Sequence, residues 1–223
     1  RDMVGPYFSQ SERIGSIEQE EHNMKVSLSN PTNAYCPQTF YTYGTYKEDG
    51  TPNFGLFCWF GFCWDGELSI MACIGGEKLT KDRIRATGRF SANLVTEELL
   101  PLANYFGNKS GYDPNKMQVD AVISKGRVLD IPILQKSPWI FELEVKQTIP
   151  LDDSEIYICK IRNTLVEEQF AEKAREGKGP MHINEIKPVV GWGGGTFFKV
   201  GDQILPDMET HLEMTDTPGS ADP

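Results

Sequence analysis

The sequence predicts a mainly β protein with short helices, built as a β-barrel with helical excursions. Six or seven segments have the aromatic and β-branched composition of strands, and the helical segments between them are short. This order differs from the regular alternation of strands and helices that builds parallel α/β sheets. A chain of 223 residues with 39% hydrophobic and 11% aromatic residues is also long enough to bury a sizeable core.

The first three predicted strands surround an aromatic stretch and are separated by two Asp-Gly turns. Residues 39–46 are rich in Tyr and Thr, and the turn at Asp49-Gly50 makes them a hairpin with residues 53–63. A second turn, at Asp65-Gly66, leads from residues 53–63 into a strand at 67–75. The sequence therefore predicts two consecutive hairpins that share their middle strand.

The later elements are short helices and strands. Gly88 closes the first helix, and Thr96 caps the second, whose first turn is acidic. Alternating apolar and charged residues mark the two longest strands. The predicted helices are 80–88, 97–106 and 167–176, with an amphipathic piece near 114–120, and the predicted strands are 90–95, 139–149, 155–166 and 196–200. Residues 107–116 and 191–195 are predicted to be loops, and residues 132–138 a connector.

The chain is predicted to hold one domain with two appendages. Residues 1–30 are polar and weakly patterned, and we interpret them as an N-terminal arm that could contain a short helix near 16–23. Residues 31–200 hold the patterned segments and form the domain, whereas residues 201–223 form a polar C-terminal tail.

Composition argues against several functional classes. The 22 Lys and Arg residues stand against 32 Asp and Glu residues, a formal net charge of −10 that does not suit a nucleic-acid surface. Asp65-Gly66-Glu67 interrupts the aromatic stretch, which is too short to cross a bilayer, because a spanning helix needs about 20 apolar residues. Five cysteines without a Cys-x-x-Cys pair fit reduced, mostly core thiols of a cytoplasmic protein. The scattered His22, His182 and His211 predict no metal site.

Residues between Pro52 and Lys116 have the order and spacing of a known family. They are Pro52, Asn53, Trp59, Gly61, Cys63, Thr80, Ile84, Phe90, Tyr105, Phe106, Gly107, Ser110, Gly111 and Lys116. With these residues the chain resembles the flavin reductase-like, FMN-binding split-barrel family, and above all its flavoredoxin branch, from about Asn33 to Phe198. The resemblance implies a Greek-key split β-barrel, a homodimer, and one FMN per subunit in a cleft near the dimer interface.

Three residues are candidates for contact with the flavin ring. A protein holds an isoalloxazine ring with apolar or aromatic walls and a few hydrogen bonds. Phe57, Cys58 and Trp59 occupy positions where similar proteins turn the barrel strand toward the flavin. The alternative for each of them is that the side chain only packs in the core.

Two further groups of residues are candidates for binding the FMN phosphate. A phosphate needs backbone N–H groups, hydroxyls and a cation, preferably at the N-terminus of a helix. Lys78 and Thr80 supply this chemistry at a glycine-rich strand exit, and Ser110, Gly111 and Lys116 supply a second set from the next loop. Read alone, a lysine on a loop is in most cases a solvated surface residue, but the spacing of the two sets matches the family and favours phosphate binding.

The resemblance leaves two functions open. The first is an enzyme that passes electrons from NAD(P)H through flavin to an acceptor; the second is a flavoredoxin-like FMN electron-transfer protein that a partner protein reduces. Many reductases of the family carry a Gly-Asp-His segment where this chain has Asp152-Asp153-Ser154, which puts nicotinamide turnover in doubt. A relative without flavin is a third alternative. The sequence contains no nucleophile arrangement of Ser-His-Asp or Cys-His type and assigns no catalytic residue, and flavin chemistry needs none.

Overall fold

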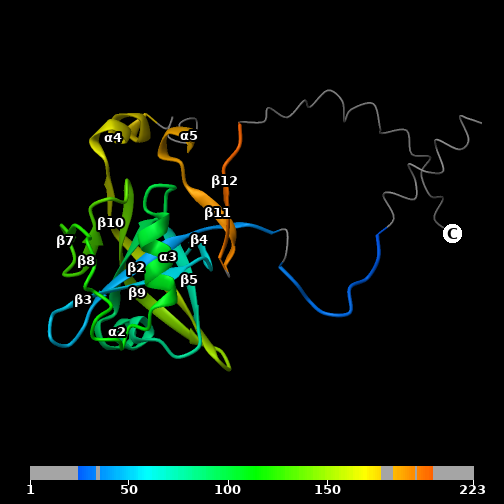
Figure 1. Ribbon diagram of the computed structural model, residues 1–223, viewed down its shortest axis with the longest axis horizontal. Helices are drawn as coiled ribbons and strands as arrows, with labels where there is room; N and C mark the ends of the chain where they lie inside the picture. The colour runs from blue at the N-terminus through cyan, green and yellow to red at the C-terminus, as the bar shows by residue number, and fades with distance from the viewer. Residues whose placement is uncertain (1–24, 34–35, 177–182, 194, 203–223) are drawn as a thin grey trace, which may run out of the picture. The chain divides into compact units, whose positions relative to one another are not determined.

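The computed structural model describes residues 25–33, 36–176, 183–193 and 195–202 (Figure 1). The chain divides into two compact units, residues 1–33 and 34–223. The described part of the first unit is an exposed segment without helix or strand, and the helix considered near 16–23 lies outside the described residues. None of the described helices has the length and apolar character needed to cross a membrane.

The second unit is mainly β with short helices, as predicted. Its strands are β1 (Gln38–Thr39), β2 (Tyr41–Tyr46), β3 (Pro52–Phe57), β4 (Phe60–Trp64), β5 (Leu68–Gly75), β6 (Arg89–Leu94), β7 (Ile123–Lys125), β8 (Pro132–Leu134), β9 (Trp139–Pro150), β10 (Ser154–Val166), β11 (Val189–Gly193) and β12 (Thr196–Lys199). Its helices are α2 (Leu79–Thr87), α3 (Leu100–Asn108), α4 (Glu168–Arg175) and α5 (Ile183–Ile186).

One antiparallel sheet forms the body of this unit, with the strand order β3-β2-β6-β9-β10-β5-β4. Its edge strands β3 and β4 are consecutive in the chain, separated only by Cys58 and Trp59. Because neighbouring strands lie about 4.8 Å apart, so short a connection can join the two edges only if the sheet curls until they meet. Among the described residues no backbone ladder pairs β3 with β4, so the barrel is split and the predicted fold class is confirmed.

The curled sheet separates two apolar clusters. The first fills the barrel and includes Tyr43, Phe90 and Tyr157, while the second lies between α3 and β3 and includes Phe54 and Phe106. Successive side chains of a strand point to opposite faces, so β3 contributes to both clusters. In Figure 1, α2 and α3 lie against the β2–β3 part of the sheet, in agreement with their contacts.

The predicted single strand at 53–63 is wrong. The chain breaks at Cys58-Trp59, because β3 pairs with β2 and β4 pairs with β5 at the opposite edge. Aromatic residues continue on both sides of the break, so composition gives no sign of it. Both Asp-Gly hairpins are confirmed, and at the first the N–H of Thr51 donates to the carboxylate of Asp49 over 2.8 Å.

Other differences concern short elements. Thr96 accepts a 3.3 Å hydrogen bond from the N–H of Leu99 as predicted, but α3 begins only at Leu100. Residues 114–120 form turns, the connector at 132–138 contains β8, and the predicted loop at 191–195 begins within β11. Strands of two to five residues are too short to show a periodic pattern in the sequence. They are recognised only by the strands with which they pair. The prediction of mostly core thiols is wrong, because Cys159 is the only fully buried cysteine among the described residues; Cys58, Cys63 and Cys73 are partly buried, and Cys36 is exposed.

Candidate functional site

A cleft of about 240 Å³ brings the predicted cofactor residues together. It lies where the N-terminus of α2, the end of β3 and the loop after α3 meet. Six of the eight predicted residues line it, namely Phe57, Lys78, Thr80, Ser110, Gly111 and Lys116. Cys58 packs against the cluster under α3 and Trp59 is half-exposed, and neither lines the cleft. Their contact with a flavin ring stays a prediction.

The first turn of α2 offers backbone donors to the cleft. Lys78 is the N-cap residue in an extended conformation, and no side-chain hydrogen bond caps this end of the helix. The first hydrogen bond of the helix is donated by the N–H of Asp82 to the carbonyl of Lys78 over 3.1 Å. The N–H groups of the preceding turn therefore have no acceptor within the helix and, together with the helix dipole, favour an anion.

Asn53 orients the hydroxyl of Thr80. The amide nitrogen of this fully buried residue donates to Thr80 Oγ1 over 3.0 Å and to Thr45 Oγ1 over 3.4 Å. Because the Thr80 oxygen already accepts a hydrogen bond, its hydrogen is available to a ligand. Asn53 was not predicted as a site residue, although asparagine is rare inside strands and its presence in an aromatic strand was a usable signal.

Gly111 lets the loop after α3 close over β3. A Cβ at this position would lie 2.7 Å from Leu79 Cβ and 3.0 Å from Asn53 Oδ1, closer than packed atoms normally approach. Asn53 Oδ1 is buried and has no hydrogen-bond partner within the described residues. An unused buried acceptor therefore lies directly behind Gly111, although Asn53 itself does not line the cleft.

Lys116 is a buried cation without a counter-ion. The residue is only 2% exposed, and among the described residues its ammonium group makes no ion pair. Its Nζ atom lies 6.0 Å from the centre of the Phe106 ring, a weak attraction. Burial, and to a lesser extent the charge of Lys47, lowers the pKa of Lys116 to about 8. A buried charge without a partner is costly, so this position is suited to an anion that a ligand brings.

The acidic residue in the cleft is already neutralised. Glu77 forms ion pairs with Lys81 over 3.0 Å and with Arg85 over 3.2 Å. These hydrogen bonds, that of Lys81 first, lower the pKa of the Glu77 carboxyl. Its charge therefore opposes an incoming anion less than a free carboxylate would. The four-residue spacing of Glu77 and Lys81 was a signal for this pair that the sequence analysis did not use.

Comparisons with known proteins agree with this architecture. A family model described as a flavin reductase like domain matches residues 34–185. Flavoredoxin of Desulfovibrio vulgaris (Miyazaki F) is 26% identical with a TM-score of 0.71, and the match covers 83% of this chain and 98% of that one. Flavoredoxin from Methanosarcina acetivorans is 18% identical with a TM-score of 0.71, over 84% of this chain and 97% of that one.

A third solved structure shares the fold. Nitrilotriacetate monooxygenase component B from Bacillus cereus is 15% identical with a TM-score of 0.69, over 82% of this chain and 99% of that one. The structures below 25% identity show the shared fold alone. No curated protein sequence matches the chain.

Replacing Lys116 with Met should stabilise the cofactor-free protein at neutral pH. The fall of the Lys116 pKa from 10.5 to about 8 means that the fold disfavours its charged form, by about 3 kcal/mol. This cost is fully present below pH 8. It shrinks toward pH 10.5, where the Lys116 side chain is already neutral in the folded protein and is losing its proton in the unfolded chain. We expect Lys116→Met to raise the free energy of unfolding by about 1–3 kcal/mol at pH 7, and by less at pH 10.

Urea unfolding at the two pH values measures this difference. Lys109→Met is the matched control, because Lys109 lines the same cleft but is exposed. A loss of stability in Lys116→Met at pH 7, or an equal gain at both pH values, would contradict the interpretation of Lys116 as a buried charge.

Proposed function

The chain belongs to the flavin reductase-like family, and from this premise we propose that it is an FMN-dependent oxidoreductase whose cleft holds the phosphate of FMN. The buried, unpaired ammonium of Lys116, facing the same cleft as the uncapped first turn of α2, carries the proposal. A phosphate group would supply the counter-charge that the protein lacks, and phosphates bind readily at helix N-termini.

Each lining residue has a task in this proposal. Lys78 and Lys116 provide positive charge, Thr80 and Ser110 provide hydroxyl donors, and Gly111 lets the loop approach. Asn53 acts through Thr80 as a positioning residue. Bound FMN would supply the redox group that accepts and returns electrons.

The cleft also has an aromatic wall that fits a flavin. Phe57 lines the cleft and stacks on the buried Tyr43 with ring centres 4.4 Å apart and an angle of 12° between the planes. This stacking fixes the Phe57 ring, and Cys58 and Trp59 follow it directly in the chain. A cavity of about 240 Å³ suits the phosphate and adjoining chain rather than the whole cofactor. The flavin ring would therefore extend beyond the cleft.

The turn between β9 and β10 helps to distinguish NAD(P)H from a partner protein as the electron donor. The carbonyl of Asp153 accepts a hydrogen bond of 2.7 Å from the N–H of Gly76, so this turn adjoins the segment that enters α2. Asp152 and Asp153 are both exposed there, at the place where similar reductases carry a histidine. Two carboxylates near the site would repel an anionic nicotinamide dinucleotide. Of the two donors considered, this favours a partner protein, as in an electron-transfer flavoprotein, over NAD(P)H.

A second copy of the chain is the proposed partner in assembly. The hairpin of β4 and β5, with the residue before it, carries large apolar side chains that are 43–77% exposed: Trp59, Phe62, Trp64, Leu68 and Met71. Such surfaces mark interaction sites, and a two-fold dimer would cover the same hairpin in both copies. The hairpin follows directly on Phe57 of the cleft, so a dimer interface here would lie close to the cofactor.

Replacing Lys78 with Ala should weaken FMN binding without unfolding the protein. The loss of a hydrogen bond to a charged group corresponds to about 1.5–3 kcal/mol, or an increase of about 10- to 150-fold in Kd. Titration followed by flavin fluorescence measures the affinity. Lys136→Ala is the matched control, because Lys136 is an exposed lysine outside the cleft. Equal affinities of Lys78→Ala and the unmodified protein would remove Lys78 from the site.

The donor can be identified with the FMN-loaded protein under anaerobic conditions. We expect reduced ferredoxin, used as a protein donor, to bleach the flavin absorbance band, and NADH and NADPH to bleach it far more slowly. Repeated turnover of NADH or NADPH with an added acceptor would instead establish the nicotinamide-dependent reductase. Absence of any bound flavin would exclude both hypotheses.

Association and FMN binding should be linked. If the cofactor site is completed by a second subunit, FMN raises both the thermal midpoint and the dimer fraction by mass action. Sedimentation velocity at low micromolar concentration, with and without FMN, measures the dimer fraction, and Trp64→Asp should lower it. An FMN-saturated protein that sediments as a monomer would place the whole site within one chain.

A further inference from the structure

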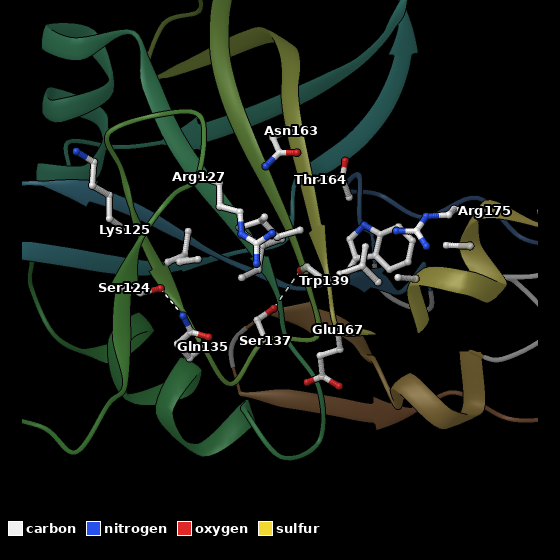
Figure 2. Close-up of a pocket in the computed structure, with 16 residues that line it drawn as sticks. Ser124, Lys125, Arg127, Gln135, Ser137, Trp139, Asn163, Thr164, Glu167 and Arg175 are labelled. Atoms are coloured by element: carbon white, nitrogen blue, oxygen red, sulfur yellow. Dashed lines mark hydrogen bonds between the residues drawn. The ribbon is translucent and has the colours of Figure 1, made fainter. Parts of the chain in front are cut away.

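A second and larger pocket lies elsewhere on the barrel. Its volume is about 700 Å³, within the range of small-molecule sites. The hairpin β7–β8, the first residues of β9, the last residues of β10 and the helix α4 surround it (Figure 2). It shares no lining residue with the cofactor cleft. The proposed FMN site therefore leaves it unexplained.

An indole ring forms a firm wall of this pocket. Trp139 begins β9, pairs with Val166 at the end of β10, and packs on its inner side against the barrel core. The N–H of Glu167 donates to the carbonyl of Pro138 over 3.0 Å, which ties the start of α4 to the same point. Because the strands and the core hold Trp139 in place, its ring offers a fixed flat surface to a ligand.

A rigid loop places Arg127 at the pocket. The fully buried carboxylate of Glu142 accepts hydrogen bonds from the N–H groups of residues 127, 128 and 129, over 2.8, 2.9 and 2.6 Å. It also accepts one from Asn163 over 2.9 Å. Gly126 permits this arrangement, because a Cβ there would lie 2.8 Å from Glu142 Oε2. Four hydrogen bonds to one buried carboxylate fix the backbone from which the Arg127 side chain extends.

Arg175 reaches the pocket from α4. It is the last residue of this helix, where a cation is favoured by the helix dipole. Phe170 buries one face of α4, and an ion pair of 2.9 Å joins Lys173 to Glu185 of α5. Figure 2 shows the side chains of Arg127 and Arg175 extending into the pocket from opposite sides in this view, with Trp139 between them.

Both guanidinium groups of the pocket are free to bind a ligand. Neither forms an ion pair or a side-chain hydrogen bond within the described residues, whereas the third lining cation, Lys125, pairs with Asp130 over 3.0 Å. Glu167 is the lining carboxylate, and it accepts a hydrogen bond from Gln169 over 2.6 Å. In a chain with a formal net charge of −10, unpaired arginines on both sides of one pocket favour an anionic ligand.

We propose that this pocket binds a planar organic anion, namely an aromatic or heteroaromatic carboxylate. Its carboxylate lies between Arg127 and Arg175, and its ring lies against Trp139. Arginine suits this task because its planar fork binds a carboxylate through two parallel hydrogen bonds, which lysine cannot do. The aromatic wall discriminates against small anions that lack a ring. This site is separate from the proposed FMN site and does not depend on it.

Calorimetric titration of the FMN-saturated protein with three small molecules tests the ligand class. Benzoate has both the ring and the charge, benzamide has the ring alone, and acetate has the charge alone. We expect benzoate to bind at least 10-fold more tightly than either of the other two. Comparable binding of benzamide and benzoate, or no measurable binding of benzoate at millimolar concentration, would overturn the proposal.

Matched variants test the residues. Arg127→Gln and Arg175→Gln should each weaken benzoate binding at least 10-fold, while Lys125→Gln, which removes a paired charge from the same lining, should leave it unchanged. An equal loss of benzoate affinity in all three variants would mean that only the net charge of the pocket matters. That result would overturn the proposed roles of Arg127 and Arg175. FMN affinity serves as the control for folding of each variant, because these residues lie outside the cleft. If the protein does not bind FMN, the same benzoate titrations without FMN still test the pocket.

Discussion

The structure depends on one covalent constraint, the two-residue connection between the opposite edges of its main sheet. Cys58 and Trp59 join β3 to β4, and three steps along the chain span at most about 10 Å. An open sheet with this strand order would hold its edges much farther apart, so the sheet has to curl. Curling encloses the barrel cluster around Tyr43, Phe90 and Tyr157. It also leaves a seam where β3 and β4 lie without a shared ladder.

The cleft proposed to hold the FMN phosphate is a consequence of where β3 lies in this arrangement. One face of the strand packs under α3 through Phe54 and Leu56. The other face carries Asn53, which holds Thr80 at the start of α2, and Phe57, which closes on Tyr43. A single strand thus fixes a helix N-terminus, a returning loop and an aromatic wall around one cavity.

Both pockets offer an unpaired cation to an anionic ligand, but the cations differ in burial. In the cleft the cation is Lys116, whose burial makes its charge costly to the free protein, so that a bound anion has a large effect. In the second pocket Arg127 and Arg175 are exposed, their charges stay hydrated, and the cost to the fold is small. The first arrangement suits a resident group such as a cofactor phosphate, and the second suits a ligand that exchanges with the solvent.

The sequence by itself determined the fold class, the two Asp-Gly hairpins, the long strands β9 and β10, and the two sets of candidate phosphate ligands that the structure brings into one cleft. The β composition, the hairpins and the long strands follow from local patterns, whereas the split barrel and the two candidate sets also rest on the resemblance to the family. Tertiary structure alone decided the break at Cys58-Trp59, the task of Asn53, the burial of Lys116 and the pinning of the Arg127 loop by Glu142. The task of Asn53 and the fixing of the Arg127 loop depend on hydrogen-bond partners 13 or more residues away. Local sequence patterns do not predict such contacts, because the curl of the sheet brings the partners together.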